Sequence, residues 1–138
     1  MPDTLIPYSA RIDKLKASAR EVGAKLCLID HGELMGWLTG YQGTETMYRA
    51  LLVPLEGEPW LVLRGLDAPQ AERHSWLTEI IGFKDWEDPH DQVSLSIIDH
   101  GYSSAKILVD DASYSFTVYA QNYYLHIYLK RSLFIKQD

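Results

Sequence analysis

The sequence has one cysteine and no excess of basic residues, and both shortages exclude broad classes of protein. A single thiol, at Cys27, cannot build a disulfide framework. Because Cys27 stands in an apolar run, we expect a buried side chain rather than a reactive thiolate. With 13 Lys and Arg against 19 Asp and Glu, the net charge is −6. The chain therefore has no broad basic surface for a nucleic-acid backbone, and an anionic membrane would repel it.

Long hydrophobic runs are also lacking. No apolar stretch approaches the roughly 20 residues that cross a bilayer, and the start lacks the basic-then-apolar pattern of a signal peptide. Low-complexity tracts and internal repeats are not visible. We therefore expect a cytoplasmic protein that binds neither nucleic acid nor membrane. A length of 138 residues with 46% hydrophobic content suits one domain with its own core.

What the sequence does have is an alternation of helical and extended patterns. Apolar residues recur at helical spacing over residues 12–22, and Gly23 follows as a stop. The continuous apolar run at 25–30 predicts a strand covered on both faces. Further along, the patterns predict short helices near 33–38 and after Asp67, strands at 80–83 and 105–109, a helix from Asp88 and Pro89 toward Ile98, a last helix from Ser113 to about Leu129, and an edge strand at 133–135.

A β-hairpin is predicted in the middle of the chain. Residues 48–54 and 60–63 form two β-prone runs, and the connection between them contains Gly57 and Pro59. Strands alternating with helices around such a hairpin predict an α/β fold, with a mixed sheet flanked by helices.

The segment Trp37-Leu38-Thr39-Gly40-Tyr41 and the order of these elements resemble a known family. The segment matches the (Y/W)LTG(Y/F) loop in the N-terminal domain of creatinase/prolidase, or pita-bread, metallohydrolases. Arg11-Ile12-Asp13-Lys14-Leu15 matches the opening of that domain's first helix. Arg64-Gly65-Leu66-Asp67-Ala68 and Asp85-Trp86 look more like the creatinase and ectoine-hydrolase side of the family than the proline-peptidase side. The resemblance covers nearly the whole chain and implies a ribonuclease H-like arrangement.

The resemblance implies a domain that is not itself catalytic. The family's enzymes hold two divalent metal ions (Mn, Co or Zn) on two Asp, one His and two Glu of a C-terminal domain, and none of these ligands carries over onto this sequence. We therefore expect residues 1–138 to be a single N-terminal domain without a cofactor. Its expected parent is a hydrolase of the Xaa-Pro dipeptidase (prolidase), creatinase or ectoine hydrolase type. The expected partners are the parent's catalytic domain and a second copy in a homodimer.

One segment is implied to contact substrate. In creatinase-like members a loop of this domain reaches the neighbouring subunit's active site, and the matching positions are Thr44, Glu45, Thr46, Met47, Tyr48 and Arg49. The planar guanidinium of Arg49 would pair with two oxygens of a substrate carboxylate. The alternative is a solvated or structural arginine at the entrance of a strand. Creatinase has an aromatic–Gly–Arg order at these positions, whereas this chain has Met47-Tyr48-Arg49. This departure leaves open the choice between a proline peptide and a creatine-like or ectoine-like compound.

Residues 85–91 invite a metal interpretation, because they combine four acids with His90. Their spacing matches no metal motif, however, and a helix that starts at Pro89 behind a capping acid explains the same residues. The remaining histidines are scattered and favour surface or loop positions over metal ligation: His31, His74, His100 and His126.

Two other functions are weighed against this one. A ribonuclease H-type nuclease needs carboxylates that converge from strand ends on metal ions. Asp30 and Asp110 could occupy such ends, but the acidic balance and the missing basic groove argue against it. A stand-alone protein-interaction domain is suggested by the aromatic residues late in the chain, since tyrosine buries area and keeps a polar tip: Tyr114, Phe116, Tyr119, Tyr123, Tyr124 and Tyr128. Trp37, Trp60, Trp76 and Trp86 are expected in the core or in interfaces.

Overall fold

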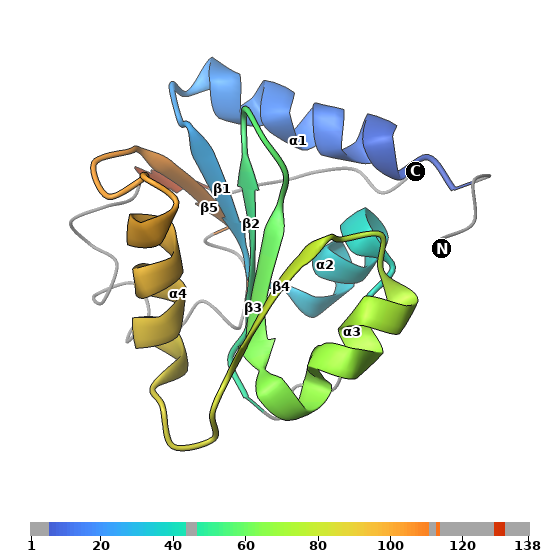
Figure 1. Ribbon diagram of the computed structural model, residues 1–138. Coiled ribbons are helices and arrows are strands. Elements are labelled where there is room, and N and C mark those ends of the chain that lie inside the picture. The colour runs from blue at the N-terminus through green and yellow to red at the C-terminus, as the bar shows by residue number, and fades with distance from the viewer. Residues whose placement is uncertain (1–5, 44–46, 111–112, 114–128, 132–138) are drawn as a thin grey trace.

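A mixed β-sheet forms the centre of the molecule. The computed structural model describes residues 6–43, 47–110, 113 and 129–131. In these residues a six-stranded sheet has the order β4-β3-β2-β1-β5-β6, and helices cover both of its faces (Figure 1). This arrangement confirms the predicted α/β class. No helix among the described residues is long and apolar enough to cross a membrane.

The strands are short, and the central ones are fully buried. All residues of β1 and β2 are buried, as their continuous apolar runs predict. β1 pairs antiparallel with β2 and parallel with β5, and β2 and β3 form the predicted antiparallel hairpin. β4 and β6 lie parallel to β3 and β5. The bounds are β1 Leu26–Ile29, β2 Ala50–Pro54, β3 Trp60–Arg64, β4 Glu79–Phe83, β5 Ile107–Asp110 and β6 Leu129–Arg131.

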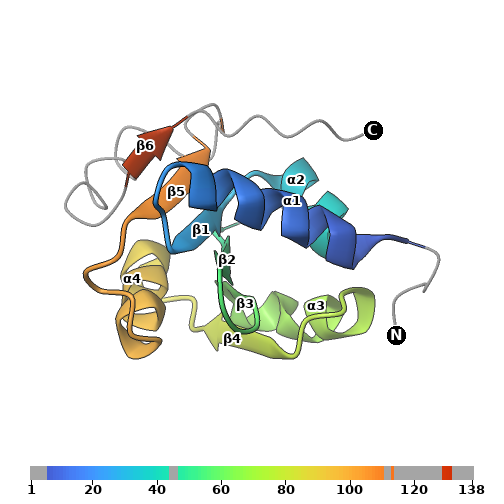
Figure 2. The same cartoon turned by 90° about the horizontal axis from the view of Figure 1, so that it is seen from above.

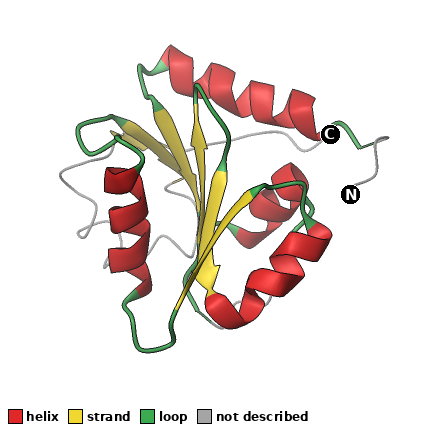
Figure 3. Cartoon of the chain, in the orientation of Figure 1, coloured by secondary structure: helices red, strands yellow, loops and turns green. Residues whose placement is uncertain are grey.

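The helices largely follow the predicted pattern. α1 begins before the expected Arg11, and at its end Gly23 adopts a φ of +73°, which favours glycine. Asp67 occupies the N-cap of α3 as expected, but its side chain makes no capping hydrogen bond. Figure 3 distinguishes helices, strands and loops by colour. The bounds are α1 Tyr8–Glu21, α2 Gly32–Thr39, the 3₁₀ turn η1 Gly65–Asp67, α3 Ala68–His74 and α4 Pro89–Asp99.

Two buried clusters lie on opposite faces of the sheet. α1, α2 and α3 cover one face, called here the α1–α3 face, and α4 lies against the other, the α4 face. Viewed from above, the sheet passes between these two groups (Figure 2). Alternation along β1 sends Cys27 and Ile29 to the α1–α3 face and Leu26 and Leu28 to the α4 face. Both faces of the same strands therefore contribute to the core.

The end of the chain departs from the prediction. Leu129, expected near the end of a helix, lies instead in β6, which pairs with β5. Pairing satisfies backbone groups on the outer edge of β5, and this long-range gain outweighs the local helical pattern. Apart from Ser113 and Leu129, the predicted last helix lies outside the described residues. The predicted strand at 133–135 and the six aromatic residues from Tyr114 to Tyr128 also lie outside them.

Candidate functional site

α2 ends in a tight turn built by Thr39 and Gly40. The Thr39 hydroxyl donates to the Met35 carbonyl (2.7 Å) and accepts from the Tyr41 backbone N–H (3.1 Å). Gly40 has a φ of +90°, and a Cβ added there would come within 2.6 Å of the His74 carbonyl oxygen. Both the backbone conformation and this close approach require glycine. The Leu-Thr-Gly segment is thus a structural turn that directs the chain away from α2.

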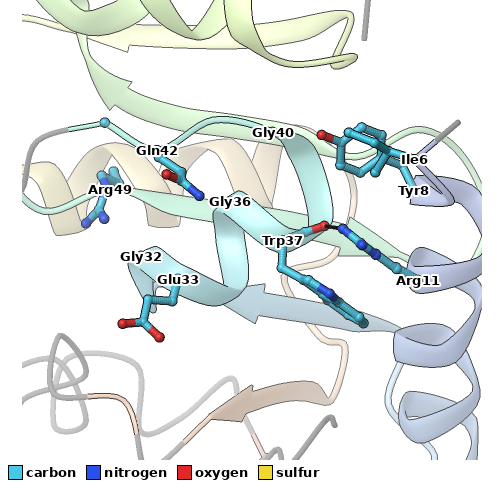
Figure 4. Close-up of a pocket in the computed structure, with 11 residues that line it drawn as sticks. Ile6, Tyr8, Arg11, Gly32, Glu33, Gly36, Trp37, Gly40, Gln42 and Arg49 are labelled. Atoms are coloured by element: carbon cyan, nitrogen blue, oxygen red, sulfur yellow. Dashed lines mark hydrogen bonds between the residues drawn. The ribbon is translucent and has the colours of Figure 1, made fainter. Parts of the chain in front are cut away.

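A pocket of about 810 Å³ opens beside this turn, on the α1–α3 face (Figure 4). Gly32 and Gly36 of α2 and Gly40 at its C-cap follow one another at a spacing of four residues, so this stripe contributes no side chains to the pocket. Residues from α1, α2 and the segments flanking them complete the wall: Ile6, Tyr8, Arg11, Glu33, Trp37, Gln42, Gly43 and Arg49.

Two arginines line opposite ends of this pocket (Figure 4). The guanidinium of Arg11 donates to the Trp37 carbonyl (2.6 Å) and lies 4.6 Å from the centre of the Trp37 ring and 5.7 Å from that of Tyr8. Arg49 is only 5% exposed. Burial and the Asp67 charge raise the pKa of Tyr41, and the nearby Arg49 acts in the opposite direction. Among the described residues that line the pocket, two are arginines and one, Glu33, is a carboxylate, so this part of the lining suits a ligand that carries an anionic group.

The predicted substrate-contacting segment is only partly described. Thr44, Glu45 and Thr46 lie outside the described residues, whereas Met47, Tyr48 and Arg49 lie within them. Tyr48 packs against the α4 face, and Arg49 lines the pocket on the other face. The alternative was a solvated or structural arginine. Burial of Arg49 argues against the solvated form and leaves the structural one open. A contact between this segment and substrate stays a prediction.

The hydroxyl and the ring of Tyr48 are each held by another residue. Its hydroxyl donates to Oδ2 of Asp30 (2.9 Å), and its ring stacks on His90, with 4.0 Å between ring centres. Asp30 is 1% exposed. Burial raises its pKa to about 6, against the lowering effect of hydrogen bonds from Ser113 and Tyr48, and the Asp110 charge adds to the rise. Sequence reasoning singled out Asp30 and Asp110, and the parallel pairing of β1 with β5 does bring these strand ends together.

The acids of residues 85–91 have structural roles. Asp88 caps α4 by accepting from the His90 N–H (2.8 Å), which confirms the capped-helix interpretation. Asp85 accepts two hydrogen bonds of 2.7 Å from Arg64. Among the described residues no three His, Cys, Asp or Glu side chains gather as a metal site, so these residues do not fit the pair of metal ions that the resemblance implies.

His31, His100 and the thiol also sit in structural contacts, whereas His74 is exposed at the end of α3, as expected of a surface histidine. His31 caps α2 by accepting from the Leu34 N–H (3.3 Å). His100 stacks on Trp60 at 3.7 Å and contacts the Glu79 carboxylate at 2.9 Å. Cys27 is buried, as expected, and burial raises its pKa to about 12, which disfavours the thiolate. His126 lies outside the described residues.

Sequence reasoning missed most of the pocket. Arg11 was matched only to the opening of a helix, and Trp37 only to the Leu-Thr-Gly segment and to core or interface positions. The spacing of Gly32, Gly36 and Gly40 is the one signal that could have indicated a helix face without side chains of its own. No local pattern could have shown that Arg11 meets Trp37, because the contact joins residues 26 positions apart.

Comparisons with known proteins agree on a single family. The chain matches the family model described as the creatinase/prolidase N-terminal domain over residues 11–122. It is 31% identical over 107 residues to a putative dipeptidase, YkvY, of Bacillus subtilis, covering 76% of this chain and 29% of that protein. It is 33% identical over 78 residues to the ectoine hydrolase of Halomonas elongata, covering 56% and 20%. The chain thus spans less than a third of the length of these relatives.

Solved structures show the same fold. A Creatine_N superfamily domain of a dipeptidase from Streptococcus thermophilus superposes with a TM-score of 0.73 at 16% identity, over 89% of this chain and 90% of that one. A proline dipeptidase from Streptococcus agalactiae gives 0.76 at 16% identity, over 91% and 94%. A prolidase from Thermococcus sibiricus gives 0.71 at 23% identity, and there the match covers 91% of this chain but 34% of the other.

Proposed function

The chain belongs to the creatinase/prolidase N-terminal domain family, and from this we propose that it serves as the non-catalytic N-terminal domain of a metal-dependent hydrolase. The membership confirms the family inferred from the Leu-Thr-Gly segment. The substrate of that hydrolase is a proline dipeptide or a small creatine-like or ectoine-like compound, in line with relatives named as a dipeptidase and an ectoine hydrolase. The metal ligands belong to a C-terminal catalytic domain, consistent with relatives more than three times as long as the match.

Within the parent protein the domain has two roles. It contributes to a homodimer, and its segment 44–49 meets substrate at the neighbouring subunit's active site. The placement of Arg49 is the observation that carries this proposal. Its guanidinium lines the pocket while the residue is 5% exposed, so it is already largely desolvated. A buried guanidinium binds a carboxylate more strongly than an exposed one, because water competes less for both groups.

The mass of the endogenous polypeptide tests the domain assignment. Captured from its native cell with an antibody against this chain, the polypeptide should have a mass well above 15.8 kDa. The purified 138-residue chain should show no metal-dependent amidase activity. A captured mass equal to that of the chain, or intrinsic amidase activity, would contradict the proposal.

Arg49→Ala tests the substrate contact. In the full-length enzyme, loss of this charge-assisted contact should raise KM about tenfold or more, with a smaller effect on kcat. Arg49→Lys keeps the charge but loses the planar fork, so it should recover only part of the affinity. Arg64→Ala is the control, because Arg64 ends the neighbouring strand β3 and does not line the pocket. Equal KM values for wild type and Arg49→Ala would remove Arg49 from the site.

A stand-alone protein-interaction domain is the second candidate. Trp86 is 81% exposed and Leu66 is 71% exposed. Leu66 comes shortly after Arg64 and Trp86 directly after Asp85, and Arg64 and Asp85 form an ion pair. Exposed Trp and Arg side chains are common anchors of protein interfaces. The captured mass separates the two candidates, since this one requires a polypeptide no larger than the chain itself.

A further inference from the structure

Helix α4 has a histidine stacked on an aromatic ring at each end. His90, in its first turn, stacks on Tyr48, and His100, just past its end, stacks on Trp60. Tyr48 precedes β2, whereas Trp60 pairs with Leu52 farther along that strand. The two stacks are alike in kind, but only the one at Tyr48 involves the segment 44–49 that is proposed to meet substrate.

The groups that hold Tyr48 come from outside that segment. Asp30 follows β1 and accepts the Tyr48 hydroxyl at 2.9 Å. His90 belongs to α4 and packs on the ring. Together they fix the far end and the flat face of one side chain. Such a contact restrains the backbone of Tyr48 more than either interaction alone, because the ring can neither slide nor rotate freely.

Arg49 is the next residue along the chain, and it faces the other way. Tyr48 packs against the α4 face, while Arg49 lines the pocket on the α1–α3 face. Successive side chains of an extended backbone point to opposite sides. A twist of the backbone that released Tyr48 would therefore also turn Arg49 away from the pocket.

We propose that Asp30 and His90 are positioning residues, which hold Tyr48 on the α4 face and thereby fix the direction in which Arg49 enters the pocket on the opposite face. This inference rests on the proposed function of Arg49. It adds two residues that touch no substrate, one of them a buried carboxylate.

The charge of Asp30 makes this hold dependent on pH. An ionised carboxylate accepts a shorter and stronger hydrogen bond than a neutral one, and Asp30 has a pKa of about 6. The groups that face it are Tyr48, Ser113 and Asp110. The Asp88 and Asp91 charges raise the pKa of His90, against the larger lowering effect of its burial. Protonation of Asp30 should loosen Tyr48 as the pH falls through about 6.

The raised pKa also separates positioning from stability. A carboxyl whose pKa is raised on folding stabilises the fold below its ordinary pKa of 3.8, and this contribution is lost as the pH rises through about 6. At neutral pH the ionised Asp30 therefore costs stability. Asp30→Asn should raise the midpoint of thermal unfolding while it weakens the hold on Tyr48. If the contact were merely structural, Asp30→Asn would lower the midpoint of thermal unfolding as well as weaken the hold on Tyr48.

Amide hydrogen exchange of the 138-residue chain tests the inference directly. Tyr48→Phe deletes one oxygen atom and keeps the ring stack, and Asp30→Asn keeps the shape of the acid, so both variants should fold. Each should speed exchange of the Ala50 and Leu51 amides about tenfold. His100→Gln, which breaks the other stack, should leave these amides unchanged. Wild-type protection, corrected for intrinsic exchange, should fall below about pH 6, and that of Asp30→Asn should not.

Kinetics of the full-length enzyme supply the second readout. Tyr48→Phe and Asp30→Asn should raise KM several-fold, up to about tenfold, with kcat nearly unchanged. Unchanged exchange at Ala50 and Leu51 in both variants would overturn the positioning role, and so would an equal effect of His100→Gln. If Arg49→Ala leaves KM unchanged, the proposed function fails, and the exchange data alone then decide whether Asp30 holds Tyr48.

Discussion

At the scale of single residues, His100 shows how a polar side chain is fitted between the sheet and α4. Its Nδ1 lies 2.6 Å from the Ser96 carbonyl and its Nε2 2.9 Å from Oε2 of Glu79. Burial alone would lower the pKa of His100, but the hydrogen bonds to Glu79 and to the Ser96 carbonyl outweigh it, so the pKa is raised above 6.5. The charged imidazole is thus the form that the fold favours.

The sign of this shift predicts how stability depends on pH. A histidine with a raised pKa stabilises the fold fully below 6.5, and this contribution is lost as the pH rises through the raised value. The unfolding free energy of wild type should therefore exceed that of Glu79→Gln at about pH 5.5, by at most about 1 kcal/mol because solvent screens the pair. At about pH 9 the difference should vanish. Urea titrations at both pH values measure it, and a constant difference would contradict this reading of His100.

Residue roles were predictable where the partner is close in sequence. Asp88 caps the helix that begins at the next residue, and its partner His90 lies two positions away. Cys27 is buried because its neighbours are apolar. The contacts that hold Tyr48 were not predictable, because Asp30 is 18 positions away in sequence and His90 of α4 is farther away still. Such pairs depend on the register of the sheet rather than on local pattern.

At the scale of elements, the turn after α2 links the family motif to packing. Gly40 provides the positive φ, Thr39 ties the turn to Met35, and the Leu38 carbonyl accepts a hydrogen bond from the Trp76 indole (2.9 Å). The turn is therefore fixed both to its own helix and to the segment that follows α3.

Gly40→Ala should destabilise the fold more than a substitution at an ordinary positive-φ glycine. Left-handed backbone costs alanine roughly 1–2 kcal/mol, and the clash with the His74 carbonyl oxygen should add about 1–3 kcal/mol. Gly57→Ala is the matched control, because Gly57 has a φ of +102° and its added Cβ would meet nothing closer than 4.0 Å. Thermal and urea unfolding of both variants give the comparison. Equal losses would mean that the His74 contact can relax.

Elements with a strong local pattern were predicted well, and an element that depends on a distant partner was not. The hairpin of β2 and β3 was predicted from two apolar runs and a Gly-containing turn, and the antiparallel pairing of the two strands confirms it. β6 has no such pattern: its sequence, Leu129–Arg131, places two basic residues after one leucine. Only the open edge of β5 makes it a strand.

At the scale of the whole molecule, both faces of the core depend on the same strands. Leu15 belongs to the cluster on the α1–α3 face and Ile97 to that on the α4 face, and both are 0% exposed. Because each strand from β1 to β5 contributes alternate residues to the two clusters, neither face can melt without disturbing the other. The described part of the chain should therefore unfold as one cooperative unit.

Leu15→Ala and Ile97→Ala test this cooperativity. Each should lower the unfolding free energy by about 2–5 kcal/mol, and each should shift one common transition. Helical circular dichroism should report on both faces together. In a background in which Trp37, Trp76 and Trp86 are replaced by Phe, the fluorescence of buried Trp60 should report on the α4 face. Coincident curves in both variants are expected. If Leu15→Ala moved the dichroism curve but not the fluorescence curve, the two faces would be separate folding units.

The family and the fold could be predicted from the sequence, but the pocket could not. A recognisable turn and an order of elements are enough to identify a domain. The pocket brings together α1, α2 and the entrance of β2, and which of their side chains meet depends on how the helices cross the sheet. Arg49 illustrates the difference: its possible role was inferred from a matching position, whereas its burial came only from the packed structure.

The two histidine stacks give α4 an electrical asymmetry. Burial lowers the pKa of His90, whereas the pKa of His100 is raised. At a pH between the pKa of His90 and that of His100, the imidazole of His90 in the first turn is neutral, and the imidazole of His100 just past the last turn carries a positive charge. The macrodipole of a helix is positive at its start and negative at its end. The same residue type is therefore charged where the helix field attracts a cation and uncharged where the field would repel one.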